Sequence, residues 1–284
     1  MAIRISVGLN KKQLVGANDF ILDNLTTNLV SAWSTRKLIS TANSAFRLRR
    51  SSDDAESDFF FGTDGDVDQS VVATFLGGSN GFFTKIYDQV GSNHLRDTTL
   101  TLQPSYLVSS GKIVVDFDGV LNKMTSQNLL GISGDLDTSV FSIIQPDNVL
   151  SGSQAAYGWG DNTVRGNFGI DAGARGAGVV SVEYGTAPCI FQTCDTTLQK
   201  FTITKTAGTI NTTTVLRRNG SAQSIQVGSD TGTPSVVDTT FFYGKFNTSF
   251  PYDGKVNECI VYDAVVSGAT ITSIESDQLT YWGV

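Results

Sequence analysis

Short β-rich runs separated by turn residues fill most of the chain after Phe59, and this pattern limits the fold more than any other feature. Runs such as "KIVVDFDG", "SVFSIIQP", "KFTITKTAG" and "GKVNECIVYD" carry β-branched and aromatic residues, with Gly, Asn, Asp and Ser between the runs. No helical segments alternate with them, which argues against a parallel sheet with crossover helices. The sequence therefore predicts an all-β fold, a two-sheet antiparallel jelly-roll sandwich.

Two segments with helical spacing flank these runs. Within residues 11–44, apolar residues including Leu29 and Trp33 recur at the spacing of a helix, which predicts a short N-terminal helix. Near the other end, Ser267 is a suitable N-cap, and Ile271 and Ile274 follow it at helical spacing. We therefore expect the sandwich to close with a short C-terminal helix.

The 284 residues are expected to form a single sandwich domain at 29–284, behind an N-terminal arm at 1–28 that can lie on a neighbouring subunit. Hydrophobic residues make up 40% of the chain, enough for a sizeable core. The formal net charge of −7 repels a phosphate backbone, so we expect no nucleic-acid partner.

Membrane and metal partners are also not expected. No segment approaches the roughly 18 apolar residues of a membrane span, and the first residues lack the apolar stretch of a signal peptide. Synthesis in a cytoplasm is the corresponding expectation. A single histidine and three cysteines do not supply an ordinary zinc site, and we predict neither a metal nor a cofactor.

The most charged run is "FRLRRSSDDAESDF", at residues 46–59, in which arginines precede acids. Arginine can form bidentate pairs with carboxylates, and such pairs can hold a helix against a sheet. We interpret the run as a structural clasp rather than a catalytic site. The residues assigned to this clasp are Arg49, Arg50, Asp53, Asp58 and Asp88.

Two parts of the chain resemble known families. The segments "SAWSTRKLISTANSAFRLRRSSDDAESDFFF" and "TKIYDQVGSNHLRDTT" resemble the catalytic jelly roll of family 54 α-L-arabinofuranosidases. The later order of "FSIIQP", "FTITKTAG" and "GKVNECIVYD" resembles a concanavalin A-like or laminin G-like jelly roll. Together the resemblance covers about residues 30–284 and implies this fold and a glycan ligand.

The resemblance also implies a nucleophilic glutamate preceded by paired cysteines. The nearest segment is "SQAAYGWGDNTVRGNFGIDAGARG", where Ala155 and Ala156 stand in place of the cysteines and Asp171 in place of the glutamate. Aspartate is one methylene shorter, which displaces a nucleophile from the anomeric carbon. If the chain is an enzyme, its candidate catalytic residues are Asp171, Asp161 and Asp195.

A ligand-binding role suits the segment "YGWGDN". Aromatic rings can stack on sugars, although packing in the core is the slightly more common role for them. The candidate ligand-binding residues are Tyr157, Trp159, Asp161 and Asn162.

Three functions follow from this resemblance and the departures from it. The leading one is a non-enzymatic bacteriophage virion structural protein, a capsid decoration or tail component with a lectin-like fold. Its expected partners are other virion proteins and a host surface glycan, and we expect a homo-oligomer. The alternatives are an α-L-arabinofuranosidase-like glycoside hydrolase and a soluble carbohydrate-binding lectin. Head or tail location stays open.

Overall fold

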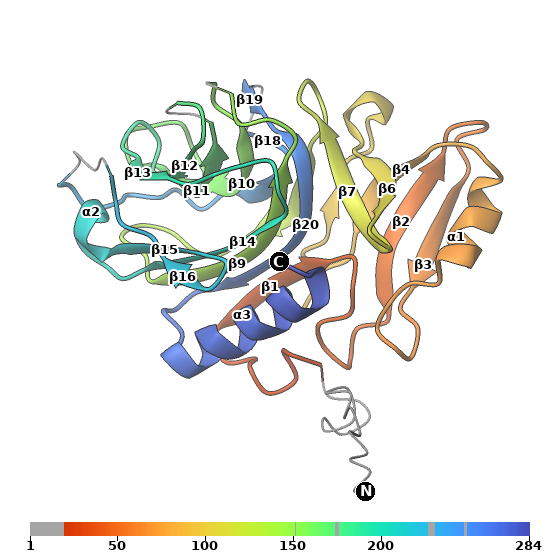
Figure 1. Cartoon of the computed structure of the whole chain (residues 1–284), viewed down its shortest axis with the longest axis horizontal. Coiled ribbons are helices and arrows are strands. Elements are labelled where there is room, and N and C mark those ends of the chain that lie inside the picture. The colour runs from red at the N-terminus through yellow and green to blue at the C-terminus, as the bar shows by residue number, and fades with distance from the viewer. Residues whose placement is uncertain (1–19, 151, 174–175, 227–230, 247–248) are drawn as a thin grey trace, which may run out of the picture.

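The computed structural model describes residues 20–284 except 151, 174–175, 227–230 and 247–248 (Figure 1). Most of the predicted N-terminal arm, residues 1–19, lies outside the described residues. The rest of the arm packs on this chain's own domain, because Leu22 is fully buried against Leu38 and Ile274.

The described strands form an antiparallel β-sandwich, which confirms the predicted fold class. Hydrogen bonds link 18 strands in one network that folds into two layers. The first layer contains, in spatial order, β3 (Glu56–Phe60), β2 (Ser44–Arg50), β4 (Gly81–Ile86), β5 (Leu95–Arg96), β8 (Met124–Leu129), β17 (Thr240–Tyr243), β10 (Ala155–Gly160), β11 (Asn167–Ala172), β12 (Val179–Glu183) and β13 (Cys189–Gln192).

The second layer contains β1 (Leu29–Ser34), β20 (Asp253–Tyr262), β9 (Thr138–Pro146), β14 (Gln199–Lys205), β15 (Thr214–Arg218) and β16 (Ser221–Ala222). Strands β6 (Ser105–Ser109) and β7 (Lys112–Asp118) join the layers by pairing with β4 and β20. A separate hairpin consists of β18 (Lys245–Phe246) and β19 (Ser249–Pro251). Aromatic rings fill the space between the layers, and Trp33 of β1 stacks on Phe241 of β17 with 4.7 Å between ring centroids.

Helices are short and few among the described residues. They are α1 (Gln69–Leu76), the 3-10 turn η2 (Leu100–Leu102), α2 (Ile210–Thr213) and α3 (Gly268–Trp282). Helix α3 packs against β14 and β9 of the second layer (Figure 1), and the Ser267 hydroxyl accepts a bond from the Thr270 N–H as its N-cap. The C-terminal helix is therefore confirmed. No described helix has the length and apolar character to cross a membrane.

The predicted N-terminal helix is wrong, because residues 29–34 form strand β1. This strand pairs antiparallel with β20, from Leu29 opposite Tyr262 to Ser34 opposite Glu258. Both of its faces are buried: Trp33 points between the layers, and Ala32 packs in the cluster under α3. A strand buried on both faces has apolar residues at neighbouring positions, and this spacing resembles that of a helix.

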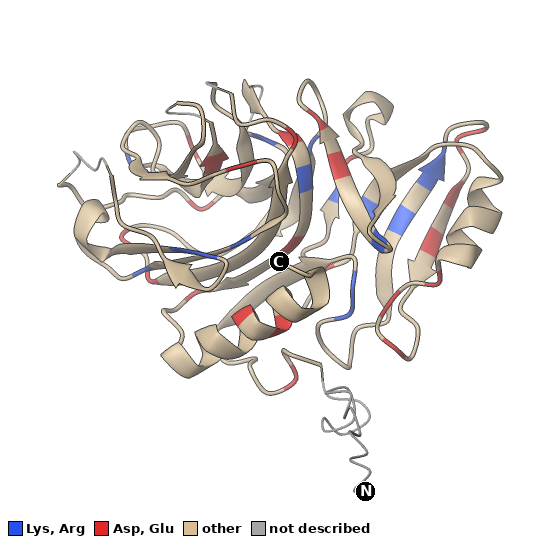
Figure 2. Cartoon of the chain, viewed as in Figure 1, with Lys and Arg blue, Asp and Glu red and all other residues tan. Residues whose placement is uncertain are grey.

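The charged run forms the β2–β3 hairpin, where basic residues of β2 face acidic residues of β3 (Figure 2). Arg50 donates two hydrogen bonds to Asp53, of 2.9 and 2.7 Å, and Arg47 donates two to Asp58, both 2.8 Å. These pairs tie strand to turn and strand to strand. Arg50 also donates a hydrogen bond of 2.5 Å to the Phe75 carbonyl of α1 and lies over the Phe75 ring, so it holds this helix, rather than the predicted N-terminal one, against the hairpin.

Two members of the proposed clasp have other partners. Arg49 pairs with Asp54 at 2.7 Å, and its Nε donates to Gln103 at 2.7 Å. Asp88 forms no ion pair with the described arginines of this run. Its carboxyl accepts backbone N–H bonds from Ala32 at 3.0 Å and Val90 at 3.1 Å, and burial raises its pKa despite these bonds.

Candidate functional site

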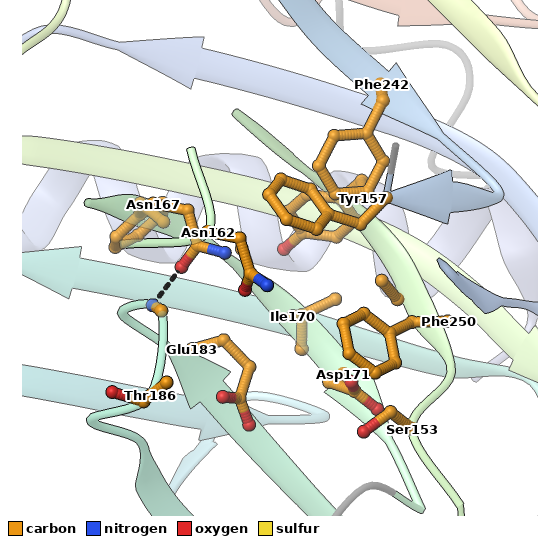
Figure 3. Close-up of a pocket in the computed structure, with 15 residues that line it drawn as sticks. Ser153, Tyr157, Asn162, Asn167, Ile170, Asp171, Glu183, Thr186, Phe242 and Phe250 are labelled. Carbon is orange, nitrogen blue, oxygen red and sulfur yellow. Dashed lines mark hydrogen bonds between the residues drawn. The ribbon is translucent and has the colours of Figure 1, made fainter. Parts of the chain in front are cut away.

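A pocket of about 310 Å³ opens on the face of the first layer that points away from the core (Figure 3). It lies over β10, β11, β12 and β17. The β18–β19 hairpin contributes Phe246 and Phe250 to its wall. Ligand pockets in proteins begin at about this size. The lining residues are Ser153, Ala155, Tyr157, Asn162, Asn167, Phe168, Gly169, Ile170, Asp171, Glu183, Gly185, Thr186, Phe242, Phe246 and Phe250.

Gly169 lines the floor of this pocket, next to a second glycine on the neighbouring strand. Gly158 of β10 lies opposite Gly169 of β11, and the next residues outward in the same row are Phe242 on β17 and Glu183 on β12. Directly opposite residues of antiparallel strands share a face, so these four positions form one row. A Cβ atom at Gly169 would come within 2.3 Å of the Tyr157 carbonyl oxygen. The missing side chains leave a hollow between the phenyl ring and the carboxyl.

Asp171 lies at one side of this floor, beside Ser153 and Phe250 (Figure 3). Only 3% of its surface is exposed, and its carboxyl accepts a hydrogen bond of 2.7 Å from the backbone N–H of Gln154. The chain that leads into β10 thus orients this carboxyl. The structure brings this one of the three predicted catalytic aspartates into the pocket.

Glu183 is the second carboxyl in the pocket (Figure 3), and it is not among the residues predicted from the sequence. Ser181 lies opposite Asp171 and donates a hydrogen bond to Glu183, so all three share one face of neighbouring strands. Diagonal neighbours of this kind lie roughly 7–8 Å apart. The two catalytic carboxyls of glycoside hydrolases lie about 5–10 Å apart, and these diagonal positions are compatible with that range.

Polar groups form the opposite rim. Asn162 and Thr186 come from loops, and Asn167 begins β11 (Figure 3). The Asn167 side-chain oxygen accepts a hydrogen bond from the Gly185 N–H, which holds the loop after β12 in place. A cavity that combines phenyl rings with a few amides and carboxyls has the composition of a small-molecule site.

The two aromatic residues predicted to bind a ligand are not exposed for stacking on a sugar. Tyr157 and Trp159 are fully buried, on the face of β10 that points into the core. The Tyr157 hydroxyl accepts a bond of 3.0 Å from Ser142, and the Trp159 indole N–H donates to the Ile132 carbonyl at 3.2 Å. Tyr157 contributes only to the pocket's inner wall, and Trp159 does not line it.

The two other predicted aspartates lie elsewhere. Asp161 lines an adjoining cavity, where its carboxyl accepts the Thr163 N–H at 3.0 Å. Asp195 pairs with Arg218 outside the pocket. Its burial opposes ionisation, but hydrogen bonds from Thr197 and Arg218 outweigh this and lower the pKa of Asp195. Within the described part of the chain, no three His, Cys, Asp or Glu side chains gather as metal ligands.

Comparisons with known proteins reveal the fold and little else. No family model matches the chain, and no curated protein matches it. Among solved structures, an arabinofuranosidase complexed with arabinofuranosyl-α-1,2-xylobiose superposes with a TM-score of 0.72 at 16% identity, over 91% of this chain and 64% of that one.

A GH54 α-L-arabinofuranosidase soaked with a cyclic sulfate inhibitor gives a TM-score of 0.70 at 17% identity, over 93% of this chain and 64% of that one. A mutant of a GH54 α-L-arabinofuranosidase soaked with 4-nitrophenyl α-L-arabinofuranoside gives 0.69 at 18% identity, with the same coverage of 93% and 64%. The chain thus spans less than two thirds of the length of these proteins. Their likeness establishes a shared β-sandwich fold.

Proposed function

We propose that this chain is an arabinofuranosidase-like glycoside hydrolase that binds the terminal sugar residue of a glycan in the pocket over Gly158 and Gly169. The observation that carries the proposal is the placement of Asp171 and Glu183 on one face of neighbouring strands, both lining one pocket. The fold shared with arabinofuranosidases supports the same class of substrate.

The two carboxyls have different settings, and we assign them different roles. Asp171 accepts a backbone N–H bond, which suits a carboxylate, and it is one methylene shorter than the glutamate implied by the family resemblance. The shorter side chain leaves room for a water molecule beside the anomeric carbon, so Asp171 acts as general base on that water. Glu183 protonates the glycosidic oxygen as the sugar leaves.

The test is hydrolysis of 4-nitrophenyl α-L-arabinofuranoside. Asp171→Asn and Glu183→Gln are each expected to lower kcat/KM by about 10²-fold or more, because each removes one partner of the acid–base pair. Asp195→Asn is the matched control, since Asp195 lies outside the pocket, and it should keep wild-type activity. Proton NMR of the first-formed sugar should show inversion at the anomeric carbon, as a water-mediated attack requires.

Three other outcomes would contradict parts of this proposal. Turnover that survives Asp171→Asn would remove Asp171 from the reaction. Binding of arabino-oligosaccharides in calorimetry without turnover would contradict the hydrolase and support the lectin alternative. Absence of both turnover and binding would overturn the proposal.

The virion role expected from the sequence stays a prediction, as do its virion partners, its host glycan, its cytoplasmic synthesis and the homo-oligomer. No feature of the described residues favours it over the hydrolase. Labelling of particles with antibody against this chain would test it, and light scattering on the purified protein would measure its oligomeric state.

A further inference from the structure

Most of the basic side chains that form no close ion pair lie on the face of the first layer that carries the pocket. In the described part of the chain, most lysines and arginines form ion pairs within 4 Å, whereas Lys37, Lys85, Arg96, Lys123 and Lys245 form none. Lys37 lies over the Phe20 ring, away from the pocket. The other four lie beside the pocket or on the same face of the first layer. The whole chain has a net charge of −7, so this group of cations is a local departure from its acidic character.

A second cavity of about 360 Å³ adjoins the pocket. The two share Phe242 and Phe246, whose ring centroids lie 5.2 Å apart, so this ring pair stands between them. Lys123 and Lys245 line the second cavity, together with threonine hydroxyls and one acid, Asp161. A glycan that extends from the pocket past Phe242 would therefore meet two cations and one carboxylate.

The strand register extends this basic surface. Phe242 on β17 lies opposite Thr125 on β8, Thr125 lies opposite Arg96 on β5, and Arg96 lies opposite Lys85 on β4. Opposite residues share a face, so this row continues the row of Glu183 and the two floor glycines. Neighbouring strands are about 4.8 Å apart, which places Arg96 roughly 10 Å from the Phe242 position. A short oligosaccharide spans that distance.

Arg96 is exposed, and Lys85 is half-buried with its ammonium 4.9 Å from the centre of the Tyr87 ring. Lys245 donates a hydrogen bond of 3.0 Å to the Val120 carbonyl and keeps its charge unpaired. Unpaired cations held near one another attract anions more strongly than cations that are already paired.

We propose that the second cavity and the adjoining basic row bind carboxylate or sulfate groups of an anionic glycan whose terminal sugar occupies the pocket. This inference rests on sugar binding at the pocket, and it adds the charge of the substrate and the direction in which the glycan leaves. Lys123, which lines the second cavity, and Arg96, which is exposed two strands beyond Phe242, carry the main contacts, whereas Lys245 already donates to the Val120 carbonyl.

Isothermal titration with oligogalacturonate, against the same oligomer methyl-esterified on its carboxyls, isolates the contribution of charge. We expect the wild type to bind the charged oligomer about tenfold more tightly, with the difference shrinking as salt rises. The double variant Lys123→Gln/Arg96→Gln should lose that preference, and Lys37→Gln should keep it. Chondroitin oligosaccharides with and without sulfate form the second arm, which distinguishes sulfate from carboxylate.

A neutral arabino-oligosaccharide separates failure of this inference from failure of the proposed function. The double variant should bind it as the wild type does, and Asn162→Trp, which places a ring at the exposed rim, should block both neutral and charged ligands. Equal affinity for charged and esterified oligomers, with neutral binding intact, would overturn the inference alone. If Asn162→Trp still binds the charged oligomer, the pocket and the basic row do not form one continuous site. Failure of every ligand to bind would overturn both proposals.

Discussion

At the scale of single residues, two glycines lie side by side at the floor of the pocket. Gly158 and Gly169 face each other in the middle of paired strands, where glycine weakens a strand and marks a close approach. Neither has the positive φ that favours glycine, so backbone conformation does not require it here. Close strand contact and an open floor are the reasons.

Gly169→Ala is therefore expected to destabilise the protein by about 2 kcal/mol, because the new Cβ meets backbone at 2.3 Å and the strands must separate. Urea unfolding followed by tryptophan fluorescence measures this change. Gly268→Ala is the matched control. A Cβ there meets nothing within 4 Å, and alanine favours the first turn of α3, so stability should stay the same or rise by up to about 1 kcal/mol. Equal effects of the two changes would contradict this account.

At the scale of elements, buried ion pairs attach α3 to the second layer. Glu275 of α3 accepts a 2.7 Å hydrogen bond from Thr202 and pairs with Lys200 of β14 and with Arg217 of β15 at 3.0 Å. Lys200 has no exposed surface, and burial lowers its pKa to about 8 even though Glu275 opposes the shift. The helix thus neutralises a cation that the sheet buries.

Glu275→Gln should destabilise the protein by about 3 kcal/mol, because it leaves the Lys200 ammonium buried without a counter-charge. Chemical denaturation at pH 7 measures the loss. Arg217→Gln removes a guanidinium that is 29% exposed and leaves the Lys200 pair in place, so it should cost less than about 1 kcal/mol. A larger loss from Arg217→Gln than from Glu275→Gln would show that Lys200 does not depend on the helix.

At the scale of the whole molecule, carboxylates with lowered pKa values make the fold sensitive to acid. Glu258 of β20 is fully buried, and burial opposes its ionisation, but Arg36 at 2.8 Å, Gln278 and Trp282 outweigh this and lower its pKa. Hydrogen bonds and ion pairs also lower the pKa of Glu275 against its burial. Glu258 links the segment after β1 to α3, and Glu275 links α3 to β14 and β15.

On acidification, these carboxylates take up protons in the unfolded chain at higher pH than in the fold. Their contribution to the free energy of unfolding is therefore fully present above the ordinary glutamate pKa of 4.5, and it is lost as pH falls through the lower pKa of the folded state. We expect the urea midpoint to fall steadily below about pH 4.5. The Glu275→Gln variant, with one such group fewer, should show a shallower fall. A midpoint that rises on acidification would mean that the raised pKa values of buried Asp88 and half-buried Asp116 dominate instead.

Much of the fold could be read from the order of residues. Strand runs separated by turn residues predict the antiparallel sandwich, and Ser267 with Ile271 and Ile274 predicts α3, because these signals are local. The same local signal fails at β1, where burial on both faces produces helical spacing in a strand.

Only the tertiary structure decided the site. Alternation along "VVSVEYG" places Ser181 and Glu183 on one face of a strand, but the sequence does not say which strand lies beside it. The pairing of β11 with β12 brings Glu183 to Asp171, and the pairings of β17, β8 and β5 carry the same face on to Arg96. Side-chain periodicity is a property of one strand, whereas register depends on packing between segments distant in the chain. For that reason the sequence predicted Asp171 and missed its partner.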